Sequence, residues 1–302
     1  MKSLTRAAAC AGVLALSLAA CGGQEDPLTG SNGKDTGTIV IGSQQYYSNT
    51  IIAEIYAQAL ESEGYTVQRE FEIGQREVYA SELEDGNIDV FPEYEGSLLQ
   101  YFDPDTTATS AEDIENELAE ALPEGLTALD RADATDQNAL VVTKDFAEEH
   151  NLKEIGDLAG IDGLVVGANP EFEKRSYGPE GLRDAYGVEV ELQTIDDSGG
   201  PLTVKALNDG EIDVAANIFT SSPSIASNDF VVLEDPEQIV PEEHIAPIVS
   251  DTVDTKARDI LNEISAKLDQ DQLLVLNTRS VEEQAVPEVI AADWLADQGI
   301  AD

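Results

Sequence analysis

The sequence predicts an α/β protein in which helices pack in layers on sheets. Short apolar runs typical of buried strands alternate along the chain with segments of helical periodicity. An internal echo points the same way: residues 83–90 read LEDGNIDV and residues 207–214 read LNDGEIDV, so six of eight positions match. Each copy has a Leu, a Gly suited to end a helix, and a short Ile-Asp-Val strand. We therefore expect two halves of similar topology, although helix-Gly-strand joints are common and could also have converged by chance.

The first half is expected to begin with a strand and a helix. Residues 38–42 form an apolar run that ends in Gly, as in a buried parallel strand. A helix should follow, because residues 48–50 offer N-caps and apolar side chains recur at helical spacing up to Gly64. Residues 65–73 then alternate as a second strand.

The same order of elements returns after residue 137. We expect strands at 139–142, 163–168 and 188–195, and helices at 145–150 and 179–186. Ligands of open α/β sheets bind beyond the carboxyl ends of strands. The segments that follow the two echo copies, 91–97 and 215–220, should therefore face a shared crevice.

The charge balance excludes nucleic acid as a partner. The 302 residues include 61 Asp or Glu and only 16 Lys or Arg, which gives a formal net charge of -45 at pH 7. Phosphate binding needs a basic surface, and the longest basic cluster is the pair Lys174-Arg175. With 42% hydrophobic and 25% charged residues, the composition is that of a globular protein.

Residues 1–20 are interpreted as a secretory signal. Lys2 and Arg6 precede an apolar run that is too short to span a membrane. The sequence Leu-Ala-Ala-Cys that ends at Cys21 resembles the lipobox of bacterial lipoproteins, whose Cys receives diacylglycerol and becomes the mature N-terminus. An ordinary secreted protein with a stray Cys is the alternative. Residues 21–37, rich in Gly and polar side chains, predict a flexible tether.

Motifs of enzymes are missing from the sequence. There are two histidines, His150 and His244, and no GxSxG, HExxH, CxxC or GxxxxGK[ST] motif. Pairs of acidic residues do not identify an acid-base catalyst, because a chain with 61 Asp and Glu residues contains such pairs throughout its length. The acids between 103 and 113 lack the Gly-centred spacing of a calcium loop. We expect no enzyme, no cofactor and no metal site.

Scarce positive charges and aromatic rings at expected strand ends favour a small cationic ligand. Arg175 lies on a loop after an apolar strand, where it could clamp a carboxylate or form a surface ion pair. Tyr46, Tyr47, Tyr94 and Phe219 fall on expected strand-end loops. Ring faces attract cations, although core packing is the commoner role of any single ring.

Five segments together resemble the osmoprotectant-binding lipoproteins of ABC importers, which take up glycine betaine, choline or carnitine. They are residues 41–44, 52–60, 86–96, 144–148 and 169–172. The most specific piece is Ile-Asp-Val-Phe-Pro-Glu-Tyr-x-Gly at 88–96, and the resemblance runs from residue 38 to the C-terminus.

The resemblance implies a fold and its division into lobes. The family has a two-lobed periplasmic-binding-protein fold of type II, with the ligand cleft between the lobes. For this chain it implies lobe 1 at 38–136 plus 245–302, and lobe 2 at 137–244.

The resemblance also implies ligand-binding residues. In the family an aromatic cage holds the quaternary ammonium, and other side chains bind the carboxylate. Tyr94 and Phe219 match cage aromatics, Ser97 matches the carboxylate-binding hydroxyl, and Arg175 matches the arginine.

Four further positions depart from the family pattern or vary within it. Gln44 stands where Lys is frequent in betaine binders, and Asp136 matches an acidic or amide position beside the cage. Asn138 and Glu243 occupy positions of cage tyrosines, with one residue of register open between Glu243 and His244. Tyr46, Tyr47 or Tyr177 could supply other ring faces, or Glu243 could pair directly with a ligand cation.

The function implied is solute capture for import. We expect an extracytoplasmic monomer, anchored through Cys21 to the outer face of the cell membrane, that delivers a quaternary-ammonium osmolyte to ABC permease and ATPase subunits. The alternatives are a binder of another small amine or amino-acid-like solute, a ligand sensor on the same fold, and an enzyme that uses paired carboxylates in the cleft.

Overall fold

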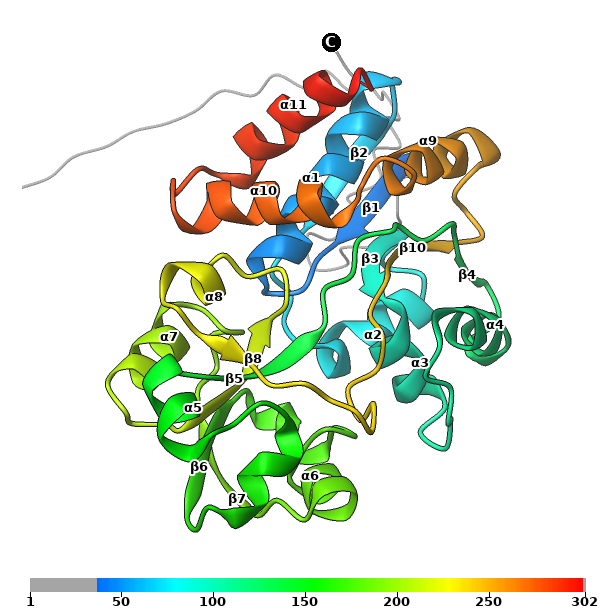
Figure 1. Cartoon of the computed structure of the whole chain (residues 1–302). Helices are drawn as coiled ribbons and strands as arrows, with labels where there is room; N and C mark the ends of the chain where they lie inside the picture. Colours follow the sequence, from blue (N-terminus) through cyan, green and yellow to red (C-terminus); the bar gives the residue numbers. More distant parts are fainter. Residues whose placement is uncertain (1–36, 301–302) are drawn as a thin grey trace, which may run out of the picture. The chain divides into compact units, whose positions relative to one another are not determined.

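The computed structural model describes residues 37–300, in which strands and helices form two five-stranded sheets (Figure 1). The expected signal peptide, Cys21 and nearly all of the expected tether lie outside the described residues. The two sheets with their helices confirm the α/β class.

The first sheet has the strand order β2-β1-β3-β10-β4. Its strands are β1 (Thr38–Gly42), β2 (Thr66–Glu70), β3 (Val90–Tyr94), β4 (Leu126–Ala128) and β10 (Ile245–Ser250). Strands β2 and β3 run parallel to β1, and β10 runs antiparallel to β3 and β4. The helices between these strands are α1 (Tyr47–Ser62), α2 (Arg76–Glu84), α3 (Glu95–Phe102) and α4 (Ala111–Ala121).

The second sheet has the order β7-β6-β8-β5-β9. Its strands are β5 (Asn138–Val142), β6 (Leu164–Ala168), β7 (Val190–Thr194), β8 (Val214–Phe219) and β9 (Val231–Val232). Its helices are α5 (Lys144–His150), η1 (Ile155–Gly160), η2 (Pro170–Lys174), α6 (Pro179–Tyr186), α7 (Pro201–Asn208) and α8 (Ser224–Ser227), where η marks a 3-10 helix. All five elements expected here from the sequence are present, and none of their ends differs by more than two residues from the expected one.

The two echo copies occupy equivalent places in the two sheets. Each leads from a helix into the central strand, α2 into β3 and α7 into β8. Gly86 and Gly210 both have left-handed backbone, with φ of 71° and 68°. Asp89 accepts a hydrogen bond from the Val40 amide at 2.8 Å, and Asp213 accepts one from the Val165 amide at 2.8 Å. These shared backbone requirements explain why the two segments read alike.

The C-terminal segment returns to the first sheet. Helices α9 (Thr255–Ser265), α10 (Gln270–Val281) and α11 (Pro287–Gln298), orange to red in Figure 1, lie beside the blue α1. Helix α1 is therefore buried on almost every side, and its apolar residues share one core with Leu273, Leu276 and Trp294. Within residues 37–300 no helix has the length and apolar character needed to cross a membrane.

Candidate functional site

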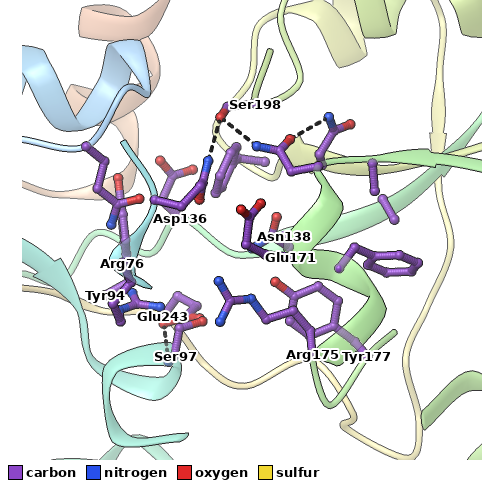
Figure 2. Close-up of a pocket in the computed structure, with 18 residues that line it drawn as sticks. Arg76, Tyr94, Ser97, Asp136, Asn138, Glu171, Arg175, Tyr177, Ser198 and Glu243 are labelled. Atoms are coloured by element: carbon purple, nitrogen blue, oxygen red, sulfur yellow. Dashed lines mark hydrogen bonds between the residues drawn. The ribbon is translucent and has the colours of Figure 1, made fainter. Parts of the chain in front are cut away.

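A small cavity lies between loops and strand ends of the two sheets (Figure 2). Its volume is about 60 Å³, which leaves room for about four to six water-sized molecules. All eight residues singled out from the sequence line it, namely Gln44, Tyr94, Ser97, Asp136, Asn138, Arg175, Phe219 and Glu243. The structure thus brings together residues that are up to 199 positions apart.

Glycine at position 96 lets two segments meet at one wall of the cavity. The chain passes at Tyr94 from β3 into α3, which places Ser97 in the first turn of the helix. A Cβ at Gly96 would lie 2.5 Å from the Glu242 carbonyl oxygen, so only glycine permits this approach. Glu243 then accepts hydrogen bonds from the Ser97 amide, at 3.0 Å, and from the Ser97 hydroxyl.

Two buried carboxyl groups at the cavity have raised pKa values. Burial raises the pKa of Glu243 to about 7, although the hydrogen bonds from Ser97 favour its charged form. Burial likewise raises the pKa of Asp136 to about 6, against the effect of a hydrogen bond from the Ser221 hydroxyl. The second oxygen of Asp136, Oδ2, has no hydrogen-bond partner among the described residues.

Arg76 also lines the cavity, and sequence reasoning missed it. Its guanidinium donates to both carboxylate oxygens of Glu93, at 3.0 and 2.8 Å, and both side chains are buried. The Tyr79 hydroxyl donates to Glu93 at 2.6 Å, and the Gln44 amide donates to that hydroxyl at 2.9 Å. Gln44 therefore belongs to a network that neutralises Arg76. Arg76 is one of only 16 basic residues and stands at the start of α2, and this scarcity was the sequence signal that could have identified it as a site residue.

Arg175 reaches the cavity from the second sheet. It follows η2, and its side chain is 19% exposed. The guanidinium contacts both carboxylate oxygens of Glu77 on α2, with Nη1–Oε1 at 3.0 Å and Nη2–Oε2 at 3.3 Å. The carboxylate that Arg175 holds in this structure is thus one of the protein's own.

Aromatic rings form part of the lining. Tyr94 and Phe219 have ring centroids 6.4 Å apart, and Phe172 and Tyr177 line the cavity on the side of the second sheet. Tyr46 stacks on Phe219 with centroids 3.9 Å apart but does not itself line the cavity, and Tyr47 does not either. Of the three tyrosines considered as substitutes for cage residues, Tyr177 alone reaches the lining.

An amide and hydroxyl network completes the wall formed by the second sheet. Asn217 donates to Asn169 at 3.1 Å, and Asn169 donates to Ser198 at 3.3 Å. Gln75 from the first half donates to the same Ser198 hydroxyl at 3.2 Å. Asn217 lies in the segment after the second echo copy, which was expected to face the crevice, whereas Asn169, Ser198 and Gln75 were not anticipated as lining residues.

Three of the side chains that line the cavity have an acceptor atom without a hydrogen-bond partner within residues 37–300. Asp136 Oδ2, Glu171 Oε2 and Asn217 Oδ1 are buried and accept no hydrogen bond from the described residues, and all three side chains line the cavity. Buried acceptors of this kind are costly unless a ligand or water satisfies them. With aromatic faces and several carboxylates, the cavity is suited to a small cation.

Comparisons with known proteins identify relatives of this chain. Residues 37–297 match the family described as the substrate binding domain of the ABC-type glycine betaine transport system. A glycine-betaine-binding protein of Pseudomonas aeruginosa is 25% identical over 281 residues, covering 88% of this chain and 89% of that protein. The glycine betaine-binding protein YehZ of Escherichia coli is 25% identical over 276 residues, covering 86% of this chain and 90% of that one.

A solved structure extends the comparison to the fold. The crystal structure of a glycine betaine/carnitine/choline ABC transporter protein superposes with a TM-score of 0.70 at 20% sequence identity, covering 87% of this chain and all of the other. At this identity the likeness establishes a shared fold, and it confirms the binding-protein fold expected from the sequence.

Proposed function

The chain belongs to the family of substrate-binding domains of ABC-type glycine betaine transport systems, and from that membership we propose that it captures a small quaternary-ammonium solute outside the cell for import. It is a substrate-binding protein rather than an enzyme. The choice of a quaternary-ammonium ligand rests on the cavity, whose lining combines aromatic rings with buried carboxylates.

The chemistry of a quaternary ammonium fits this lining. Its positive charge is spread over methyl groups that cannot donate ordinary hydrogen bonds, so ring faces and nearby negative charge provide its attraction. Tyr94 and Phe219 offer the rings, and Asp136, Glu171 and Glu243 offer the charge.

The proposed mechanism is closure of two lobes on the solute. We place lobe 1 at 38–136 plus 245–302 and lobe 2 at 137–244, a division supported by the strands of each sheet, which come from 38–128 with 245–250 and from 138–232. A ligand that contacts both lobes stabilises the closed form by its higher affinity for that form. The permease and its ATPase would then receive the closed, loaded monomer.

The proposal includes attachment to the membrane. The lipobox-like segment that ends at Cys21 supports removal of residues 1–20 and lipidation of that cysteine. Two acyl chains are enough for stable anchoring, whereas a single chain is marginal. Mass spectrometry of the membrane fraction should detect a diacylated N-terminal Cys21, and an unmodified soluble product would reject this part.

Calorimetric titration tests the ligand. We expect the purified protein to bind at least one of choline, glycine betaine and carnitine, and not proline. Tyr94→Ala should weaken binding about 30-fold, the equivalent of about 2 kcal/mol for a buried cation-ring contact. Tyr94→Phe keeps the ring and removes only the hydroxyl, so its affinity should stay within about threefold. Binding of none of the three would overturn the proposal.

A further inference from the structure

Every positive charge that lines the cavity is already held by a carboxylate of the protein. The two basic residues of the lining are Arg76 and Arg175. Arg76 is paired with Glu93 through two hydrogen bonds, and Arg175 is paired with Glu77 through two contacts of 3.0 and 3.3 Å. Within residues 37–300, therefore, no guanidinium or ammonium group of this lining carries an unpaired positive charge.

The negative charges of the lining are in the opposite situation. Asp136, Glu171 and Glu243 all face the cavity, and none of them forms an ion pair among the described residues. Glu243 accepts from the amide and hydroxyl of Ser97, which are neutral donors. One oxygen each of Asp136 and Glu171 accepts nothing. A bound cation would supply the missing positive charge.

A zwitterion such as glycine betaine would place a second charge in this cavity. Its carboxylate would meet three acids that have no ion-pair partner in the described part of the chain and two guanidinium groups whose charges are already paired with carboxylates of the protein. Neutral donors do remain, since the Tyr94 hydroxyl of the lining has no hydrogen-bond partner among the described residues, but they bring no compensating positive charge. A buried carboxylate that lies beside other acids and gains no compensating positive charge is strongly disfavoured. A hydroxyl group of a ligand, in contrast, could donate to one of the unpartnered oxygens.

We propose that this site selects monocationic quaternary-ammonium solutes that carry a hydroxyl and no carboxylate, and that Glu77 enforces the selection by occupying Arg175. The inference rests on the proposed function and narrows its ligand class. Glu77 is a positioning residue: it lies in the first turn of α2, its side chain is 44% exposed, and it is absent from the cavity lining. Its two oxygens engage both terminal nitrogens of Arg175, which a ligand carboxylate would need for bidentate binding.

The test compares choline and glycine betaine on the full chain and two variants. Glu77→Ala removes the partner of Arg175, and Glu84→Ala removes an equal charge from an exposed residue at the other end of the same helix. In the unaltered protein we expect choline to bind at least about tenfold more tightly than glycine betaine. In Glu77→Ala the Kd for glycine betaine should fall about tenfold, because a charge-assisted hydrogen-bond pair becomes available. The Kd for choline should change less than about threefold, and Glu84→Ala should alter neither Kd.

The outcomes separate this inference from the proposed function. Equal binding of both solutes, tighter binding of glycine betaine by the unaltered protein, or an unchanged Kd for glycine betaine in Glu77→Ala would overturn the inference and leave solute binding intact. Failure of both solutes and of carnitine to bind any of the three proteins would overturn the proposed function. Circular dichroism of the variants checks that they fold, which the exposure of both glutamates leads us to expect.

Discussion

The buried carboxyl of Glu243 should make the ligand-free protein less stable as the pH rises. Its side chain is 1% exposed, and burial raises its pKa from 4.5 to about 7. Of the charged groups around it, Arg76 lowers the pKa while Glu93 raises it, and Glu95 lies close enough to interact with it. Between pH 4.5 and about pH 7 the folded protein therefore binds more protons than the unfolded chain. The free energy of unfolding falls with increasing pH in that range.

The magnitude follows from the shift. A rise in the pKa from 4.5 to about 7, at about 1.4 kcal/mol for each tenfold change in proton affinity, corresponds to roughly 3 kcal/mol of stability. This stabilisation is present in full below the pKa of the unfolded chain and is lost once the pH passes the pKa of the folded protein. Glu243→Gln keeps an acceptor for Ser97 but cannot ionise. Relative to the unaltered protein, the variant should gain about 3 kcal/mol at pH 8 and only about 1 kcal/mol at pH 5.

Urea denaturation of both proteins at pH 5 and pH 8 measures these differences directly. The comparison between the two proteins cancels the contributions of the other acids. A difference that does not change between the two pH values would refute the argument from burial. A loss of stability in Glu243→Gln at pH 8 would show instead that Arg76 stabilises the ionised carboxylate more than burial disfavours it.

Three further predictions concern the site and the charge of the molecule. The affinity for choline should rise about tenfold from pH 5.5 to pH 8, because a cation favours the ionised forms of Glu243 and Asp136; a constant Kd by calorimetry would contradict this. Gly96→Ala should lower the free energy of unfolding by about 2 kcal/mol, since its Cβ would lie 2.5 Å from a carbonyl oxygen. Gly160→Ala, with open space around the new Cβ, is the control and should stay within about 0.5 kcal/mol in urea denaturation. The melting temperature should rise with NaCl, because salt screens the self-repulsion of a net charge of -45, and a flat response up to molar salt would count against that account.

Local signals in the sequence predicted much of the fold. The strand at 38–42, the helix after it and the five elements after residue 137 follow from periodicity, caps and glycines. The echo was informative because each copy meets a backbone requirement, a left-handed Gly and an Asp that binds the amide of the neighbouring strand. The burial of α1 on almost every side was not predictable in this way, because helices more than 190 residues later cover it.

The residues of the site were easier to predict than their pairings. Resemblance identified eight positions, and all eight line one cavity. The partners of the two arginines lie 17 and 98 residues away, at Glu93 and Glu77. With 61 acids in the chain, each guanidinium had many equivalent candidates, and only the tertiary structure selects among them. Whether an arginine is free for a ligand therefore could not be read from the sequence.

The contacts across the cavity bear on how much a ligand must contribute to closure. Gln45 donates to Asp196 at 3.0 Å, Gln75 donates to Ser198 at 3.2 Å, and Arg175 contacts Glu77. Each links a residue of the first half to one of the second. Hydrogen bonds and ion pairs near the surface contribute about 1 kcal/mol or less each, so together they stabilise the contact between the two halves only modestly. A ligand that contacts both halves adds to this stabilisation, and the buried acids Asp136 and Glu243 provide electrostatic attraction for a cation in the cavity.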